Sequence, residues 1–465
     1  MTRISSTRRR ISPARGSLAA LVVTSLLLLA GCGSDTTLSP GATPPATGAL
    51  GSESPSVSPG ASVSPGPTDA AAATTMLSVR AADVRLRAEP AIDAEALAAV
   101  PAGATIPLIG EPVRADGLSW YQTRFAGTDG WITSGEDGEW LSVVRNGRIA
   151  FSCRTCNDGG PGTLSVAPNG DDAQVLFGEY GVAHWAPDGS RLVIQYGDGV
   201  RLLPSLVMLT PDGTEEFSTV GSGVAWSPDG ERIAYIDPND RTLFISDLTG
   251  DRTGFEVSDL GGAEALAWSP DSTRIAFTAI DCPDCPVGEP FVGDPPISVF
   301  MFEPPGGAVV KVADGGNMGS LRWSPDGSAL SFLELDLGGG DIELRVVTFP
   351  DGSVTTHMAR GLITYGHDFS PDGTRLVGGT EHGIVVTNAD GSDQQLVYAT
   401  RPGDVVPTAP RWSPDGQWIL FERASIESDA VETWIVRADG TDARQVAAEG
   451  FGADWQPVLE PLPAP

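Results

Sequence analysis

From about residue 147 onward, the chain repeats one pattern of hydrophobic and polar positions. A short apolar run that ends in an aromatic residue leads into a polar turn and then into a second, alternating run. One copy reads Ala225-Trp226, Ser227-Pro228-Asp229-Gly230 and Arg232-Ile233-Ala234-Tyr235. Proline presets φ at the second turn position, aspartate bonds to the local backbone, and glycine tolerates the exit geometry. The pattern therefore predicts a β-hairpin in each copy.

The hairpin is part of a larger unit that recurs along the chain. A third strand follows about ten residues later, as in Leu243-Phe244-Ile245-Ser246-Asp247, and a short fourth strand completes the sheet. The aromatic anchors are spaced by 41, 42, 55, 46, 43 and 43 residues. Four-stranded propeller blades recur at about this period. The anchors are Trp185, Trp226, Trp268, Trp323, Phe369, Trp412 and Trp455.

The two ends of the repeat region each carry half of a hairpin. Arg148-Ile149-Ala150-Phe151 has a second-strand sequence with no motif before it, and Trp455 marks a first strand with no partner after it. Joining the two halves would close the ring and leave only short, protected edges. The sequence thus predicts an all-β chain with a seven-bladed propeller over residues 146–458, with six blades as the alternative, and a tail over 459–465.

The repeat resembles that of TolB-like propellers of bacterial envelope proteins over roughly residues 147–458. The copies depart from it at Ala186 in place of Ser, Ser272 in place of Gly and Phe369 in place of Trp, and the last copy lacks the turn. The resemblance implies a partner protein in an envelope assembly. The namesake of the family has six blades.

A block with a different pattern, residues 76–145, precedes the propeller. Its landmarks are Val84-Arg85-Leu86-Arg87, Pro101-Ala102-Gly103, Trp120-Tyr121 and Gly130-Trp131-Ile132. Their order and spacing resemble bacterial SH3-like domains, which often bind cell-wall peptide or glycan or merely space other modules. Trp120 and Tyr121 are candidates for a ligand groove, although a barrel this small needs its aromatic side chains first for the core.

The N-terminus predicts export and a lipid anchor. Several arginines precede an apolar run, Leu18 to Leu29, which ends in Leu29-Ala30-Gly31-Cys32. A positive segment, a short apolar segment and small residues before cysteine resemble a bacterial lipobox, which implies cleavage after residue 31 and a lipid on Cys32. The run is shorter than the roughly 20 residues that span a bilayer. Thr7-Arg8-Arg9-Arg10 leaves general and twin-arginine export both open. Residues 32–75, rich in Ser, Pro, Gly and Ala, form a flexible linker.

Charge narrows the choice of partners. The chain has 29 Lys and Arg against 60 Asp and Glu, a formal net charge of −31. Nucleic acid and anionic lipid surfaces are therefore not expected partners. We expect a monomer held at the outer leaflet of the cell membrane by its lipid alone, with envelope proteins or a cell-wall polymer as partners.

The remaining cysteines form two C-x-x-C pairs, Cys153 with Cys156 and Cys282 with Cys285. In an exported protein two local disulfides are expected. A four-thiolate zinc site and a redox role are the alternatives, but the blade register places the two pairs nearly opposite each other in a seven-membered ring.

Loops after the second strands carry many carboxylates, which form a candidate cation- or ligand-binding face or simply a solvated set of loops. No loop has calcium-site spacing, and no hydrolase or H-E-x-x-H motif occurs. We expect no metal, cofactor or catalytic residue, although a propeller lyase with clustered His184, His367 and His382 is an alternative. The candidate face comprises Asp198, Asp281, Asp284, Asp294, Asp336, Asp341 and Glu381.

Taken together, these features favour an extracytoplasmic binding or scaffold protein. The propeller is the interaction platform, and the SH3-like block is the wall-docking module. A sensor or carrier of a small ligand or cation on the acidic face is the alternative.

Overall fold

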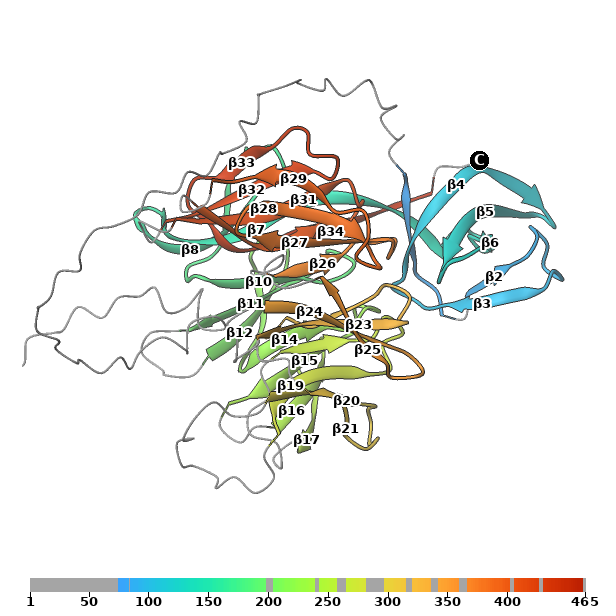
Figure 1. The fold of residues 1–465 in the computed structure, drawn as a ribbon, viewed down its shortest axis with the longest axis horizontal. Helices are drawn as coiled ribbons and strands as arrows, with labels where there is room; N and C mark the ends of the chain where they lie inside the picture. The colour runs from blue at the N-terminus through green and yellow to red at the C-terminus, as the bar shows by residue number, and fades with distance from the viewer. Residues whose placement is uncertain are drawn as a thin grey trace, which may run out of the picture. The chain divides into compact units, whose positions relative to one another are not determined.

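The computed structural model describes residues 74–82, 84–197, 204–238, 242–256, 265–281, 297–314, 320–335, 342–358, 366–401, 405–425 and 430–462. Every regular element in these ranges is a β-strand, which confirms the all-β prediction (Figure 1). Within the same ranges, no helix has the length and hydrophobicity to cross a membrane.

The SH3-like block contains six strands in the order β3-β2-β6-β5-β4-β1. Two-residue turns set its hairpins: Asp116 and Gly117 join β4 to β5, and Ala126 and Gly127 join β5 to β6, all with positive φ. Such turns match the twist of the strands they connect. The strands are β1 (Met76–Val79), β2 (Val84–Arg87), β3 (Ala96–Val100), β4 (Thr105–Ala115), β5 (Leu118–Phe125) and β6 (Thr128–Thr133).

Six sheets of four consecutive antiparallel strands follow as six propeller blades. Each begins with the strand that ends at, or contains, the aromatic anchor. Their strands are β10–β13 (Gly181–Trp185, Leu192–Gly197, Pro204–Leu209, Glu215–Val220), β14–β17 (Ser222–Trp226, Arg232–Asp237, Thr242–Asp247, Arg252–Glu256), β18–β21 (Leu266–Trp268, Ile275–Ile280, Ile297–Phe302, Val310–Asp314), β22–β25 (Arg322–Trp323, Ala329–Leu335, Ile342–Thr348, Val354–Met358), β26–β29 (His367–Phe369, Arg375–Thr380, Gly383–Asn388, Gln395–Ala399) and β30–β33 (Val405–Trp412, Trp418–Ser425, Val431–Arg437, Arg444–Ala447).

A further four-stranded set joins the two ends of the repeat region. β34 (Phe451–Pro461) pairs with β7 (Leu141–Asn157), which continues to β8 (Gly160–Val166) and β9 (Gln174–Phe177). Trp455 lies opposite Ile149, so the two half-hairpins predicted from the sequence do meet. Figure 1 shows β34, from the red end of the chain, beside β7. Six blades are thus built from consecutive strands, and this composite set closes the ring.

Strand β7 also crosses the domain boundary expected between residues 145 and 146. Its first residues pair with β1, and β1 pairs in turn with β4. Beyond the propeller, β34 continues through Leu459, Glu460 and Pro461, which lie opposite Val144, Val143 and Ser142. The first residues of the expected tail are therefore part of a strand, because the long β7 offers them a free edge.

The recurring arginine of the second strand explains how the blades pack together. Arg232 lies over the ring of Trp268, Arg274 over Trp323 and Arg375 over Trp412, with guanidinium carbons 4.8, 5.0 and 4.6 Å from the ring centroids. In each pair the arginine belongs to one blade and the aromatic anchor to the next. Cation–π contacts of this kind stabilise by about 0.5–2 kcal/mol. The repeat therefore encodes the contacts between blades as well as the hairpins within them.

A second type of contact between blades is a hydrogen bond to a polar side chain of the second strand. Ser152 Oγ, Gln195 Oε1 and Glu422 Oε1 each accept a backbone N–H from the first strand of the following blade. The donors are Gly181, Gly223 and Gly452, at 3.0, 2.8 and 2.7 Å. These bonds give a partner to N–H groups of one buried and two half-buried glycines.

Candidate functional site

The residue just before each aromatic anchor borders a cavity of about 490 Å³ in the propeller. Two of these residues are alanines, and the other five are polar or charged. The residues are His184, Ala225, Ala267, Arg322, Asp368, Arg411 and Asp454, and we call them the axial ring. The cavity is also bordered by five of the anchors and by three residues of the SH3-like block: Trp185, Trp226, Trp268, Trp323, Trp412, Gly103, Ala104 and Thr105.

Charges in the axial ring interact across neighbouring blades. Arg322 Nε lies 3.5 Å from Asp368 Oδ1, and Asp368 Oδ2 accepts the Trp412 backbone N–H at 3.0 Å. Asp454 Oδ2 accepts the Trp185 N–H at 2.8 Å. Each aspartate thus fixes the first strand of the next blade. Arg322, Asp368, Arg411 and Asp454 alternate in sign along the chain.

Burial shifts the titration of these groups toward their neutral forms. It raises the pKa of Asp368 to about 6 and that of Asp454 to about 7, against the opposing effect of Arg322. Burial and the nearby Arg322 lower the pKa of His184 to about 4. Burial therefore favours the uncharged imidazole of His184 and the protonated carboxyl of Asp454.

The three histidines considered for a lyase occupy different environments. His184 borders the axial cavity, whereas His367 is buried between blades with Nε2 2.7 Å from Ser331 Oγ. Burial and Arg322 lower the pKa of His367 to about 3. His382 is exposed beside Glu381. Among the described residues, no group of three or more His, Cys, Asp or Glu is arranged to hold a metal ion.

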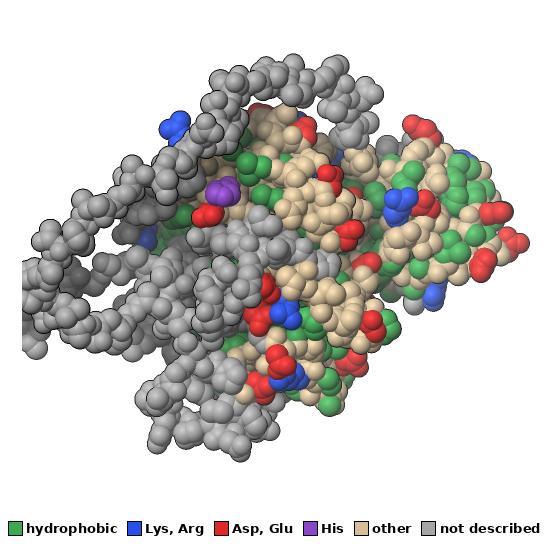
Figure 2. All heavy atoms as spheres, in the orientation of Figure 1, with side chains coloured by type: hydrophobic (Ala, Val, Ile, Leu, Met, Phe, Trp, Pro, Cys, Tyr) green, Lys and Arg blue, Asp and Glu red, His purple; other side chains and the backbone are tan. Residues whose placement is uncertain are grey.

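Two residues of the predicted acidic face are described, and each has a cationic or ionisable neighbour. Asp281 Oδ2 accepts a hydrogen bond from Lys311 Nζ at 2.7 Å, and Glu381 lies 3.6 Å from His382. Figure 2 shows acidic side chains scattered over the visible face rather than gathered in one patch. Asp198, Asp284, Asp294, Asp336 and Asp341 lie outside the described residues.

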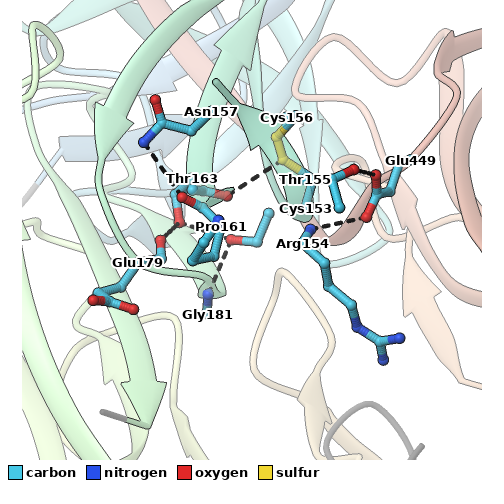
Figure 3. Close-up of a disulfide and its surroundings, with 12 residues drawn as sticks. Cys153, Arg154, Thr155, Cys156, Asn157, Pro161, Thr163, Glu179, Gly181 and Glu449 are labelled. Atoms are coloured by element: carbon cyan, nitrogen blue, oxygen red, sulfur yellow. Dashed lines mark hydrogen bonds between the residues drawn. A yellow bond between two sulfur atoms is a disulfide. The ribbon is translucent and has the colours of Figure 1, made fainter. Parts of the chain in front are cut away.

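The first C-x-x-C pair forms a disulfide between Cys153 and Cys156, as predicted (Figure 3). The short loop between them is held by Glu449, whose carboxylate accepts the Arg154 N–H at 2.9 Å and the Thr155 hydroxyl. Since Glu449 lies just before β34, the disulfide loop is fastened to the segment that closes the ring. Cys282, Cys285 and the lipid-anchor candidate Cys32 lie outside the described residues.

In the SH3-like block, the two residues predicted to line a groove, Trp120 and Tyr121, lie in different environments. Tyr121 packs in the core with Leu77, Leu86 and Ile132, which corrects its assignment to a groove. Trp120, its neighbour on β5, points the other way and borders a groove of about 430 Å³, although only 1% of its surface is exposed. The alternation of side chains along a strand makes it impossible for both residues to line one groove.

The exposed aromatic residue of this groove is Trp140, which the sequence reasoning missed. It lies just before β7, at the end of the loop Ser134-Gly135-Glu136-Asp137-Gly138-Glu139. A tryptophan that ends a polar, glycine-containing loop was the available signal.

Comparison with known proteins identifies the first module directly. Residues 82–142 match the family model described as "Bacterial SH3 domain". A search of curated proteins finds no match to this chain.

Among solved structures, TolB from Acinetobacter baumannii is similar, with 17% identity and a TM-score of 0.40 over 74% of this chain and 80% of that one. An oligogalacturonate lyase in complex with manganese is similar, with 17% identity and a TM-score of 0.44 over 71% of this chain and 98% of that one. The chain thus contains a segment that matches a bacterial SH3 domain, and a β-propeller follows it.

Proposed function

We propose that this protein is an extracytoplasmic binding or scaffold protein, anchored through lipid on Cys32, whose SH3 domain docks on the cell wall and whose propeller engages envelope partners. The observation that carries the proposal is the continuity of the two modules. β1 pairs with both β4 and β7, and β7 is a strand of the closing blade. A docking module joined to the platform by a shared sheet holds that platform at its docking site.

The axial ring supports a second candidate function, the binding of a small polar ligand. Its cavity of about 490 Å³ is of a size that suits small molecules and presents charges of both signs. In this alternative the ligand would bind at the axial ring instead of on the acidic loops. Saturable stabilisation of the protein by a small zwitterion, lost in Arg322→Ala, would favour it over the scaffold function.

The wall-docking half is tested by co-sedimentation of the purified mature protein with cell-wall sacculi. We expect a saturable fraction of the protein to pellet with the sacculi, because bacterial SH3 domains often bind wall polymers. Bovine serum albumin, another acidic protein, serves as the control for trapping. If the protein stays in the supernatant at every sacculus concentration, the wall-docking half of the proposal is wrong.

The anchor is tested in cells by metabolic labelling with a fatty acid analogue. We expect the wild-type chain to carry the label, and Cys32→Ala to lose it completely, because the thioether forms on that sulfur. Cys156→Ala is the matched control, since it removes a different cysteine. Label that persists in Cys32→Ala would contradict the anchor.

A further inference from the structure

The groove beside Trp140 has the features of a built binding site. It is lined by apolar, acidic and glycine residues from three parts of the SH3 domain, and two of its large apolar side chains, Ile92 and Trp140, are 53% and 42% exposed. The lining comprises Arg87, Ile92, Leu118, Trp120, Thr133, Gly135, Glu136, Asp137, Glu139 and Trp140, and we call it the Trp140 groove.

Trp140 is held in place even though much of it is exposed. Its backbone N–H donates to Ser134 O at 3.0 Å, and its carbonyl accepts the Arg80 N–H at 2.8 Å. The indole lies against Gly135, where an added Cβ would come within 2.8 Å of three ring atoms. Gly135 also has φ of +80°, which favours glycine. The backbone is therefore shaped to receive the ring, and the indole is preorganised for contact with a ligand.

The part of the lining that contains Ile92 is also fixed. The Ile92 N–H donates to Asp116 Oδ2 at 2.9 Å, which ties its loop to the β4–β5 turn. Ile92 and Leu118 add apolar surface to the lining that also contains Trp140. Apolar surface of this kind suits an alkyl chain.

The loop that carries Trp140 adds negative charge. Glu136, Asp137 and Glu139 are exposed and line the groove, and within the described part of the chain none of them forms an ion pair. The basic residue of the lining, Arg87, donates from Nη1 to Ala94 O at 2.7 Å. Three carboxylates against one guanidinium leave the groove negative. An aromatic face beside carboxylates attracts an ammonium group through both cation–π and Coulomb interactions.

We propose that the Trp140 groove binds a cell-wall peptide through a primary amine on an alkyl side chain. The alkyl stem packs on the apolar surface of Ile92 and Trp140, and the ammonium pairs with the carboxylates of Glu136, Asp137 and Glu139. This inference rests on the proposed wall docking and specifies the chemistry that the SH3 domain recognises there.

The test is calorimetric titration of the mature protein with muropeptides released from sacculi whose stem peptides carry a free amine. We expect saturable binding that weakens with added salt. Acetylation of the amine on the same muropeptides should weaken binding at least tenfold, because it removes the charge and keeps the stem. Trp140→Ala should have a similar effect.

A charge variant separates recognition from folding. The triple variant Glu136→Gln, Asp137→Asn, Glu139→Gln alters only exposed groups, and it should weaken binding of the free amine at least tenfold while acetylation has no further effect. The matched control, Glu111→Gln, Glu179→Gln, Glu215→Gln, changes the net charge equally at exposed positions outside the groove and should bind like the wild type.

The outcomes separate this inference from the proposed function. Equal binding of acetylated and free muropeptides, or equal affinity of the two triple variants, would overturn the amine assignment. If muropeptides do not bind but the protein still pellets with sacculi, the Trp140 groove is wrong and wall docking stands. If neither binds, both proposals fail.

Discussion

Trp455→Ala is expected to lower the free energy of unfolding by about 3–5 kcal/mol, the usual range for truncating a buried tryptophan. Trp455 is 3% exposed and packs with Ile149, Leu164, Leu420 and Ile435. These residues come from β7 and β8 at one end of the repeat region and from β31 and β32 at the other. Removing the indole therefore leaves a cavity in the core at the point where the ring closes.

Urea denaturation followed by fluorescence and by circular dichroism measures this loss. Leu396→Ala on β29 is a suitable control, because Leu396 is 53% exposed and its truncation should change stability by less than about 0.5 kcal/mol. We further expect the two probes to separate in Trp455→Ala, since blades near an open closure can unfold before the others. Unchanged unfolding of Trp455→Ala would show that the β7–β34 junction does not hold the ring together.

Stability should fall as the pH rises from about 4.5 to about 7, and Glu422 should account for a large part of the slope. Glu422 is 4% exposed on β31, and burial raises its pKa from 4.5 to about 7 against hydrogen bonds from Gly452 and Ala453. Between these values the folded state holds a proton that the unfolded state has released, so raising the pH favours unfolding. The full effect of this one carboxyl is about 3 kcal/mol.

Glu422→Gln isolates that contribution. The amide oxygen can still accept the Gly452 N–H, which Glu422 Oε1 accepts at 2.7 Å, but the side chain no longer titrates. We expect urea unfolding at pH 5, 6, 7 and 8 to give a flatter stability profile for the variant, with the largest gain over the wild type above pH 7. Asp368 and Asp454 titrate in the same range in both proteins, so the difference between the profiles reports Glu422. Parallel profiles would contradict the assignment.

The blades could be predicted because each hairpin is determined by turn residues that are close together in the sequence. Each Ser-Pro-Asp-Gly turn satisfies its own backbone: Gly230 N–H donates to Ser227 O at 2.8 Å, and Asp229 Oδ1 accepts the Glu231 N–H at 3.0 Å. The copy with Ser272 in place of glycine keeps the same turn at a positive φ of 57°. Ring closure was also predictable, because an unpaired first strand and an unpaired second strand have few other partners once the remaining hairpins are counted.

The candidate sites could be predicted only in part. The disulfide between Cys153 and Cys156 follows from a spacing of three residues, which is local. The axial ring has a sequence signal, namely the position just before each anchor. The raised pKa of Asp454 could not be predicted from the local sequence, because it results from burial by strands that are far apart in the chain.

The sequence by itself determined the all-β class, the repeating blades, the order of the two modules and the way the ring closes, since these depend on turn chemistry and on a regular period. Only the tertiary structure decided which aromatic side chains of the SH3 domain face the core and which face solvent. The local sequence does not show which of Trp120, Tyr121 and Trp140 are buried. Their burial depends on how the barrel closes around them and on Gly135, whose missing side chain makes room for the indole of Trp140.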